Sequence, residues 1–400
     1  MRGGFFAFLM LAAGSITSTA ICAQSLVPVP NPGSAHINIA RLTQQANDGN
    51  MDAQFRLGLA YELGQGVEKS LGYAIAWYQK AADRGVPGAQ NNLAHLYETG
   101  PEGVRDLSEA AKWYTRAALY GSAEAQYNIG RLYLQGRGVP QDKAEGVRWI
   151  RKSIEAGCLS AMAGLGWMYA KGFGVPKDER QALRLTRKAA KKGDLTATVN
   201  LGGFYALGIG LPQNTREARK WFEKAVKAGV AEGEFDLAIL YQTGQGGERN
   251  PQEAVRLFRL AAEQGMSKAE AVLGQIFEMA NGVDADYTEA VKWYRQAARD
   301  GDADSANRLA AILFSGKGVA RDVPEAVRLW SWAADKGNAF AQFNLAQLYA
   351  DGTGVPRDLV KARGLFTLAG KKMDVSRELN ALSSQEGVTE AFETQPETVQ

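Results

Sequence analysis

The residues of this chain that could do chemistry are few, and their spacing argues against an active site. The 400-residue sequence has only two histidines, His36 and His95, and contains neither H-E-x-x-H nor C-x-x-C. These residues cannot make a histidine-rich metal site. The hydrolase motif G-x-S-x-G and the acylating motif S-x-x-K are also absent. The sequence therefore predicts a protein that is not an enzyme and that needs no cofactor and no metal.

Glycine-rich loops of the form G-x-G-V recur along the chain, for example at residues 64–67 and 136–139. A nucleotide-binding loop would follow a strand and would carry a third glycine or the sequence G-x-x-x-x-G-K-[ST]. Neither feature occurs here. We interpret these loops as turns whose Val or Leu packs beneath a pair of helices.

Residues 1–23 have the pattern of a targeting segment. Arg2 precedes an apolar run at residues 5–13, and small and polar residues then lead to Ala23. This run is too short to span a bilayer and is typical of a secretory signal, which we expect to be cleaved after Ala23. The prediction is a periplasmic or secreted protein with no integral membrane segment after cleavage.

The two cysteines of the sequence are Cys22 and Cys158. Cys22 would be acylated if the segment were a lipoprotein signal, but Ile21 stands where such a signal prefers Gly, Ala or Ser. Lipoprotein anchoring is therefore the weaker alternative. Cys22 leaves with the signal, so we expect Cys158 to be a free, inert and partly buried thiol.

A repeat of 36 residues organises the rest of the chain. Its nine copies cover residues 53–376 without a break in the spacing. We number each copy from its first residue, position 0, and these first residues are Ala53, Ala89, Ala125, Ala161, Ala197, Gly233, Ala269, Ser305 and Ala341. A fixed period of this length is the signature of a solenoid.

Each copy predicts a first helix. Position 4 is always Leu or Ile, position 5 is always Gly or Ala, and position 8 is Tyr in seven copies. Together with position 0 these residues form one stripe on a helix, and the small residue lets a neighbouring helix come close. A glycine follows in eight of the nine copies, as at Gly64 and Gly136, and predicts a left-handed helix cap.

Position 17 of each copy predicts the start of a second helix. Ser, Asp and Asn are good N-caps, and seven copies have Glu or Gln three residues later, which predicts a capping box. The nine predicted caps are Ser70, Asp106, Asp142, Asp178, Asn214, Asn250, Asp286, Asp322 and Asp358.

The shared pattern is A-x-x-x-L-G-x-x-Y-x-x-G-x-G-V-x-x-D-x-x-x-A-x-x-W-Y-x-x-A-A-x-x-G, and residues 53–85 and 125–157 match it almost throughout. It resembles the Sel-one-like repeat family, which is related to the tetratricopeptide repeat. The resemblance implies an all-α fold, a right-handed α/α solenoid of nine 36-residue helix-turn-helix repeats. Departures such as Glu102 and Ala280 in the glycine loop are local.

The predicted organisation has five parts. Three prolines and no periodicity indicate a linker after the signal, and a single helix before the first copy would cap the array. An acidic C-terminal tail contains four Glu and no Lys or Arg. The parts are the signal peptide 1–23, the linker 24–35, the N-terminal capping helix 36–52, the nine repeats 53–376, and the C-terminal cap and tail 377–400.

The charge balance bears on the class of partner. The chain has 46 basic and 43 acidic residues, a net charge of +3, and the two signs are interspersed along the sequence. This pattern gives no basic stripe for nucleic acid. We therefore expect no nucleic-acid partner.

By analogy with tetratricopeptide arrays, the first helices would line a concave groove, with positions 2, 6, 9 and 10 open to a partner. Trp, Tyr and Arg often become interface hot spots. Arg131 is expected to be exposed, whereas Trp167 either faces the groove or packs against the next copy. The candidate partner-binding residues are Asn91, His95, Tyr127, Arg131, Trp167, Lys171 and Phe235.

The resemblance to bacterial relatives implies an exported adaptor that binds a protein or peptide in envelope assembly or signalling. One alternative is a cell-wall protein that binds peptidoglycan or muropeptides, with weak β-lactam hydrolysis as associated with some cysteine-rich relatives. Those relatives carry a cysteine pair in each repeat, which this chain lacks. A further alternative is a secreted host-interaction factor.

Overall fold

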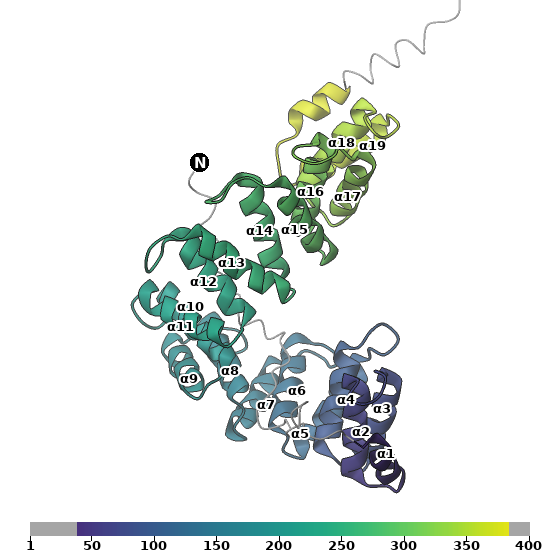
Figure 1. Cartoon of the computed structure of the whole chain (residues 1–400), viewed down its shortest axis with the longest axis vertical. Coiled ribbons are helices and arrows are strands. Elements are labelled where there is room, and N and C mark those ends of the chain that lie inside the picture. The colour runs from purple at the N-terminus through teal and green to yellow at the C-terminus, as the bar shows by residue number, and fades with distance from the viewer. Residues whose placement is uncertain (1–37, 384–400) are drawn as a thin grey trace, which may run out of the picture. The chain divides into compact units, whose positions relative to one another are not determined.

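The computed structural model describes residues 38–383, and every regular element in this range is a helix (Figure 1). The predicted signal and linker, and the tail from residue 384 onward, lie outside the described residues. A short helix at residues 376–383 follows the last of the labelled helices. These are α1 (Ile39–Asn47), α2 (Met51–Leu63), α3 (Leu71–Asp83), α4 (Pro87–Thr99), α5 (Leu107–Leu119), α6 (Ala123–Gln135), α7 (Lys143–Glu155), α8 (Leu159–Lys171), α9 (Glu179–Lys191), α10 (Leu195–Leu207), α11 (Thr215–Lys227), α12 (Ala231–Thr243), α13 (Pro251–Glu263), α14 (Ser267–Met279), α15 (Tyr287–Arg299), α16 (Ala303–Ser315), α17 (Val323–Asp335), α18 (Ala339–Asp351) and α19 (Leu359–Ala369).

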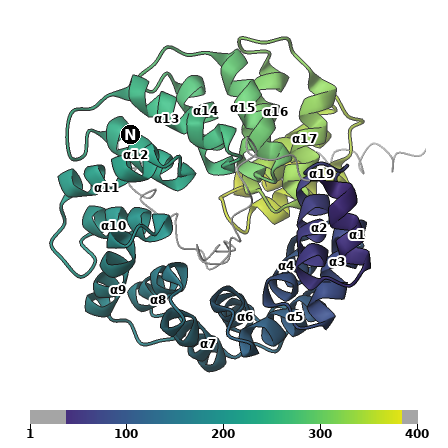
Figure 2. The same ribbon diagram turned by 60° about the horizontal axis from the view of Figure 1, so that its bottom comes forward.

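The chain divides into two compact units. Unit 1 ends at Ala228 and contains α1–α11, and unit 2 begins at Gly229 and contains α12–α19. Within unit 1 the first helices of the copies form an inner row and the second helices form an outer row (Figure 2). We call the inner row of α4, α6, α8 and α10 the first-helix row of unit 1.

Within each unit the helices pack as a series of hairpins. The first and second helix of each copy, for example α6 and α7 or α14 and α15, make the most extensive contacts, and each second helix then packs on the first helix of the next copy. The helix α1 packs on α2 through Leu42 and Ala46. The predicted all-α solenoid of helix-turn-helix repeats is confirmed.

In three copies the glycine at position 5 faces an aromatic ring of the second helix. A Cβ added at Gly58 would lie 2.5 Å from the ring of Tyr78, and one at Gly274 would lie 2.5 Å from the ring of Tyr294. Real Cβ atoms do not approach other atoms so closely, so a side chain here would push the hairpin apart. The glycine therefore sets the distance between the two helices.

All nine predicted N-caps of the second helices accept a hydrogen bond from a backbone N–H in the first turn. The capping box is not completed, however, because the backbone N–H of each cap donates elsewhere. That of Asp142, for example, donates to the carbonyl of Tyr133 at 3.0 Å. The Glu three residues after the cap instead pairs with a cation, as Glu109 does with Lys112 at 2.6 Å. The cap thus ties the two helices of a copy together.

The first helices end in a left-handed residue, with one exception. The cap of α4 is Gly100, whose φ is −61° rather than positive. Pro101 follows it, and a residue before proline is restricted to extended conformations. In α14 the left-handed cap is Ala280, with φ of 53°, the one non-glycine residue at positive φ in residues 38–383.

Candidate functional site

Six of the seven predicted partner-binding residues stand on the first-helix row of unit 1. They are Asn91 and His95 on α4, Tyr127 and Arg131 on α6, and Trp167 and Lys171 on α8. These helices lie along the inner side of unit 1 (Figure 2). The seventh residue, Phe235, belongs to α12 of unit 2.

Arg131 is not exposed, which corrects the sequence prediction. Its side chain is 0% exposed, and its Nη2 lies 2.7 and 2.8 Å from the two carboxylate oxygens of Glu98 on α4, which is itself 2% exposed. A buried charge needs a partner. Position 9 of the preceding copy supplies this partner, and the arginine therefore turns into the interface between copies rather than into a groove.

Two further groups converge on Glu98. The hydroxyl of Tyr114 on α5 donates to it at 3.1 Å, and Nη1 of Arg137 lies 3.2 Å from it. Burial raises the pKa of Tyr114 well above its usual value, and the Glu98 carboxylate raises it further. Tyr114 therefore stays protonated and remains a donor. We call Glu98, Tyr114 and Arg131 the unit 1 cluster.

A signal for such clusters is visible in the sequence but was missed. Position 9 is Glu in only the first, second and seventh copies, and position 25 is Tyr in only the same three copies. The structure joins each pair by a hydrogen bond from the Tyr hydroxyl. The pairs are Tyr78 with Glu62, Tyr114 with Glu98, and Tyr294 with Glu278.

Asn91 and Tyr127 are also buried. Asn91 accepts a hydrogen bond from Nδ2 of Asn128 at 3.4 Å, which links α4 to α6. The Tyr127 ring lies where a side chain on Gly164 of α8 would stand, and burial raises the pKa of the Tyr127 hydroxyl. Both residues therefore contribute to the packing of neighbouring first helices.

The remaining candidates differ in their exposure. His95 and Trp167 are half-buried and Lys171 is exposed. The Trp167 ring packs edge-on against Phe173 of its own copy, at 6.0 Å between ring centroids. In unit 2, Phe235 is buried and packs edge-on against Phe258. His95, Trp167 and Lys171 are thus the predicted residues that a partner could reach in unit 1.

The first-helix row of unit 1 also contains polar groups that find no hydrogen-bond partner within residues 38–383. Asn200 on α10 is 1% exposed, and neither its Oδ1 nor its Nδ2 has a hydrogen-bond partner. On α6 the Oδ1 of Asn128 is also unpartnered. Both residues occupy position 3, which the sequence analysis had not assigned to the groove. Native proteins leave few buried polar groups unpaired, so such groups call for an explanation.

Cys158 is the residue before α8, it is buried, and it is disulfide-bonded in the full-length chain. The expected free thiol concerns the chain that remains after signal cleavage, and it stays a prediction. The other cysteine of the sequence, Cys22, lies outside the described residues.

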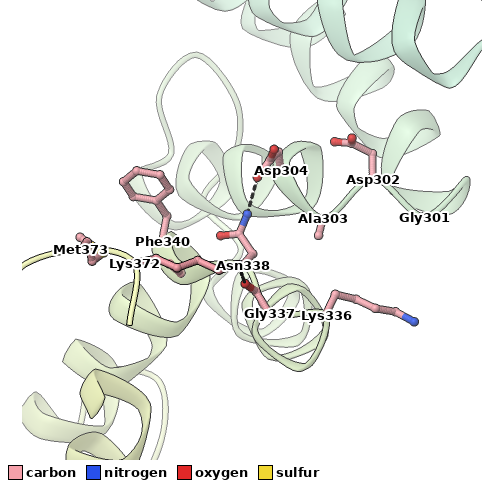
Figure 3. A pocket seen from close by; sticks show the side chains of 11 residues that line it. Gly301, Asp302, Ala303, Asp304, Lys336, Gly337, Asn338, Phe340, Lys372 and Met373 are labelled. Atoms are coloured by element: carbon pink, nitrogen blue, oxygen red, sulfur yellow. Dashed lines mark hydrogen bonds between the residues drawn. The ribbon is translucent and has the colours of Figure 1, made fainter. Parts of the chain in front are cut away.

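A cavity of about 380 Å³ lies in unit 2 at the turns between second and first helices, but its charged groups are already engaged (Figure 3). Asp302 caps α16, and Asp304 accepts a hydrogen bond from Asn338. Lys372 donates to the carbonyl of Gly337 at 2.9 Å. Three of the four charged residues of the lining are therefore engaged with protein groups, and the fourth, Lys336, lies over the ring of Trp332.

Metal and membrane sites can be assessed over the same residues. Within residues 38–383, no group of three or more His, Cys, Asp or Glu side chains is placed to hold a metal ion. Among the helices of this range, none combines the length and the hydropathy that a bilayer span requires.

Comparison with known structures finds repeat proteins that are similar to this chain. The chain is 28% identical to a Sel1 repeat protein from Oxalobacter formigenes, over 86% of this chain and 90% of that one, with a TM-score of 0.55. It is 27% identical to c5321, a protective antigen of uropathogenic Escherichia coli strains with an SLR fold, over 90% of this chain and 91% of that one, with a TM-score of 0.47. No curated protein matches the sequence.

The sequence profile of the Sel1 repeat matches nine times. The matched residues are 52–86, 87–121, 123–158, 159–194, 196–230, 231–266, 267–302, 303–338 and 339–372. They follow the nine helix hairpins and cover most of the chain. This chain therefore belongs to the Sel1 repeat family.

Proposed function

We propose that this protein is a non-catalytic adaptor that binds an extended segment of a protein partner on the first-helix row of unit 1. Sel1 repeats have a tetratricopeptide-like fold, which generally mediates protein–protein interaction. The observation that carries the proposal for this row is the amide of Asn200, which is buried and has no partner for either of its polar atoms.

An unpaired amide at this place lowers the stability of the free protein and offers hydrogen bonds to a partner in a complex. Leaving a buried donor or acceptor unsatisfied costs about 1–3 kcal/mol. A peptide backbone presents one N–H and one C=O per residue. Both residues are buried, so a backbone could satisfy these atoms where their side chains turn toward the partner on binding, which would recover the cost.

The surroundings of these amides favour a protein ligand over a small molecule. Trp167, which is half-buried, and Lys171, which is exposed, stand on α8 between them, and Trp is a frequent interface hot spot. The buried cluster of Glu98 and Arg131 links α4 to α6. A row held in this way loses little freedom on binding, so less of the binding energy goes into ordering it.

The export context and the pathway form a further part of the proposal. The signal-like residues 1–23 support a periplasmic or secreted location. In that setting the adaptor would serve envelope assembly or signalling. The location is tested by sequencing the N-terminus of the protein recovered from the periplasm or the medium, where a start at Gln24 is expected and a start at Met1 in the cytoplasm would contradict it.

Photo-crosslinking in cells tests the binding surface. A photoreactive residue at Trp167 on the inner row is expected to give one or a few discrete protein adducts. The matched control is a photoreactive residue at Lys188, which is exposed on α9 of the outer row. Adducts are then identified by mass spectrometry.

The pattern of adducts decides between the hypotheses. The same protein adducts from both sites, or none from Trp167, would contradict an inner-row binding surface. Adducts with muropeptides alone would replace the adaptor with a cell-wall protein. Adducts only with host proteins, seen when the protein is added to host cells, would replace it with a host-interaction factor.

A further inference from the structure

The second helices of unit 1 carry a row of cations at position 27 of the repeat. All five copies in unit 1 have Lys or Arg at this position, in the last turn of the helix, and all five side chains are exposed. Because the copies repeat one geometry, the same position recurs from helix to helix along the outer row (Figure 2). We call these residues the cation row, and they are Lys80 on α3, Arg116 on α5, Lys152 on α7, Lys188 on α9 and Lys224 on α11.

Unit 2 has no cation at this position. Its four copies carry Leu260, Gln296, Trp332 and Leu368 there. A cation in the last turn of a helix is favoured by the helix dipole. The second helices of unit 2 form without one at position 27, however, so the stability of the helix end does not explain why unit 1 always has one.

Position 23, one turn earlier on the same face of the second helix, gives the contrast. It is basic in seven of the nine copies, and in five of these the cation pairs with the Glu at position 20 of its own helix. These pairs are Lys112 with Glu109, Arg148 with Glu145, Lys220 with Glu217, Arg256 with Glu253, and Lys292 with Glu289.

The cation row is not neutralised in this way. Within residues 38–383 none of its five members forms an ion pair. The interspersed charges of the sequence hide this difference, because the acids at position 20 answer position 23 and leave position 27 unanswered. The row therefore presents uncompensated positive charge to solvent.

Tryptophan rings order four of the five cations. The ring belongs to position 24, one turn before the cation in the same helix. A cation over a ring keeps its charge and its outward N–H donors, but the side chain is restrained. Such a side chain loses less freedom when a ligand binds. The distances from the cation to the ring centroid are 3.9 Å for Lys80 and Trp77, 5.2 Å for Arg116 and Trp113, 4.4 Å for Lys152 and Trp149, and 5.3 Å for Lys224 and Trp221.

The arrangement favours an extended chain with repeated negative charges as the ligand. The second helices of unit 1 bend around the first-helix row (Figure 2), so a flat bilayer would meet only a few of them at once. An extended polypeptide spans about 3.3–3.6 Å per residue and can follow the bend from copy to copy. Carboxylates spaced along it would form charge-assisted hydrogen bonds with the Lys and Arg side chains.

We propose that the cation row is a second interaction surface, which binds an extended acidic segment of a protein partner along the outside of unit 1. It is separate from the first-helix row, and we expect the two surfaces to bind different segments. Each exposed ion pair contributes little, so the affinity depends on the number of pairs formed and weakens as salt is added.

Binding of fluorescently labelled poly-L-glutamate to the full-length chain, measured by anisotropy at several salt concentrations, tests the surface. K152Q/K188Q/K224Q should weaken binding about tenfold, from about two- to threefold for each exposed pair. The conservative variant K152R/K188R/K224R should bind as the unmodified protein does. The matched control R256Q/K292Q/R328Q removes the same charge from position 23 of unit 2 and should leave the affinity nearly unchanged.

Circular dichroism checks that the variants keep their helices, which is expected because the substituted side chains are exposed. Equal weakening by the row variant and the unit 2 control would show that only the net charge matters and would overturn the proposal. Absence of binding to poly-L-glutamate would also overturn it. So would row-dependent binding that is tighter to phosphatidylglycerol vesicles or to a single-stranded oligonucleotide, since the ligand would then be a membrane or a nucleic acid.

Discussion

An arginine, a glutamate and a tyrosine meet in each unit, but the arginine and the glutamate are far more buried in unit 1 than in unit 2. In unit 1, Arg131 and Glu98 are 0% and 2% exposed, and one guanidinium nitrogen contacts both carboxylate oxygens. In unit 2, Arg308 and Glu278 are 35% and 25% exposed and make one contact of 3.2 Å. A tyrosine hydroxyl donates to the glutamate in each case. We call the second set, with Tyr294, the unit 2 cluster.

The difference shows that burial, rather than the set of residues, decides how much such a cluster matters. A buried ion pair gains little over an apolar replacement, but removing one member strands a buried charge. An exposed pair leaves its partner to water and costs little to break. The unit 1 cluster should therefore be a rigid element beneath the proposed binding row, and the unit 2 cluster a replaceable one.

The largest expected effect is on removal of the arginines. R131A should lower the local free energy of unfolding around α4–α6 by about 3–5 kcal/mol, because Glu98 loses its buried cation and keeps Tyr114 and the partly exposed Arg137. R308A, the matched control, should cost less than about 1 kcal/mol. Hydrogen exchange resolved by helix measures both losses, since a repeat array need not unfold in one step. Equal losses in the two units would refute the role given to burial.

A smaller difference is expected for the tyrosines. Y114F removes a donor from a carboxylate that water cannot reach, and we expect a loss of about 1–2 kcal/mol in unit 1. Y294F leaves Glu278 partly hydrated and should cost about 0.5 kcal/mol. Chemical denaturation with exchange measurements on α5 and α15 compares them. A larger loss for Y294F would reverse the comparison.

The smallest expected effect comes from the end of α14, the helix that carries Glu278. Ala280 adopts a left-handed conformation that disfavours a side chain, so A280G should stabilise unit 2 by about 1 kcal/mol. The same position in the next copy is Gly316, and G316A should destabilise unit 2 by a similar amount. Thermal unfolding of both variants reports the two signs. A destabilising A280G would show that the cap is not strained.

Much of the fold could be predicted from the sequence because it depends on local chemistry repeated nine times. The N-caps at position 17 and the small residue at position 5 act within one copy, and both appear in the structure as expected. The exception at Gly100, whose φ is negative, also has a local cause, since Pro101 follows it in the sequence. The capping box failed because the N–H of each cap finds a carbonyl of the other helix, which no single-helix pattern contains.

The candidate site was harder to predict. Position 6 was assigned to an open groove by analogy, but Glu98 of the neighbouring copy draws Arg131 inward. Which side chains of one copy contact the next copy depends on how the helices pack, and the spacing of residues in the sequence does not determine this packing. The unpaired amide of Asn200 likewise becomes visible only when its neighbours are in place. The pairing of Glu and Tyr within copies was the one available signal.

The most direct test of the account compares the same position in the two units. Trp167 on α8 and Ala311 on α16 both occupy position 6, and Ala311 is exposed. We would place a photoreactive residue at each in the full-length protein and identify the crosslinked adducts in cells. The account predicts a discrete protein adduct from position 167 that is absent from position 311. The same adduct from both positions, or from position 311 alone, would contradict a binding row in unit 1.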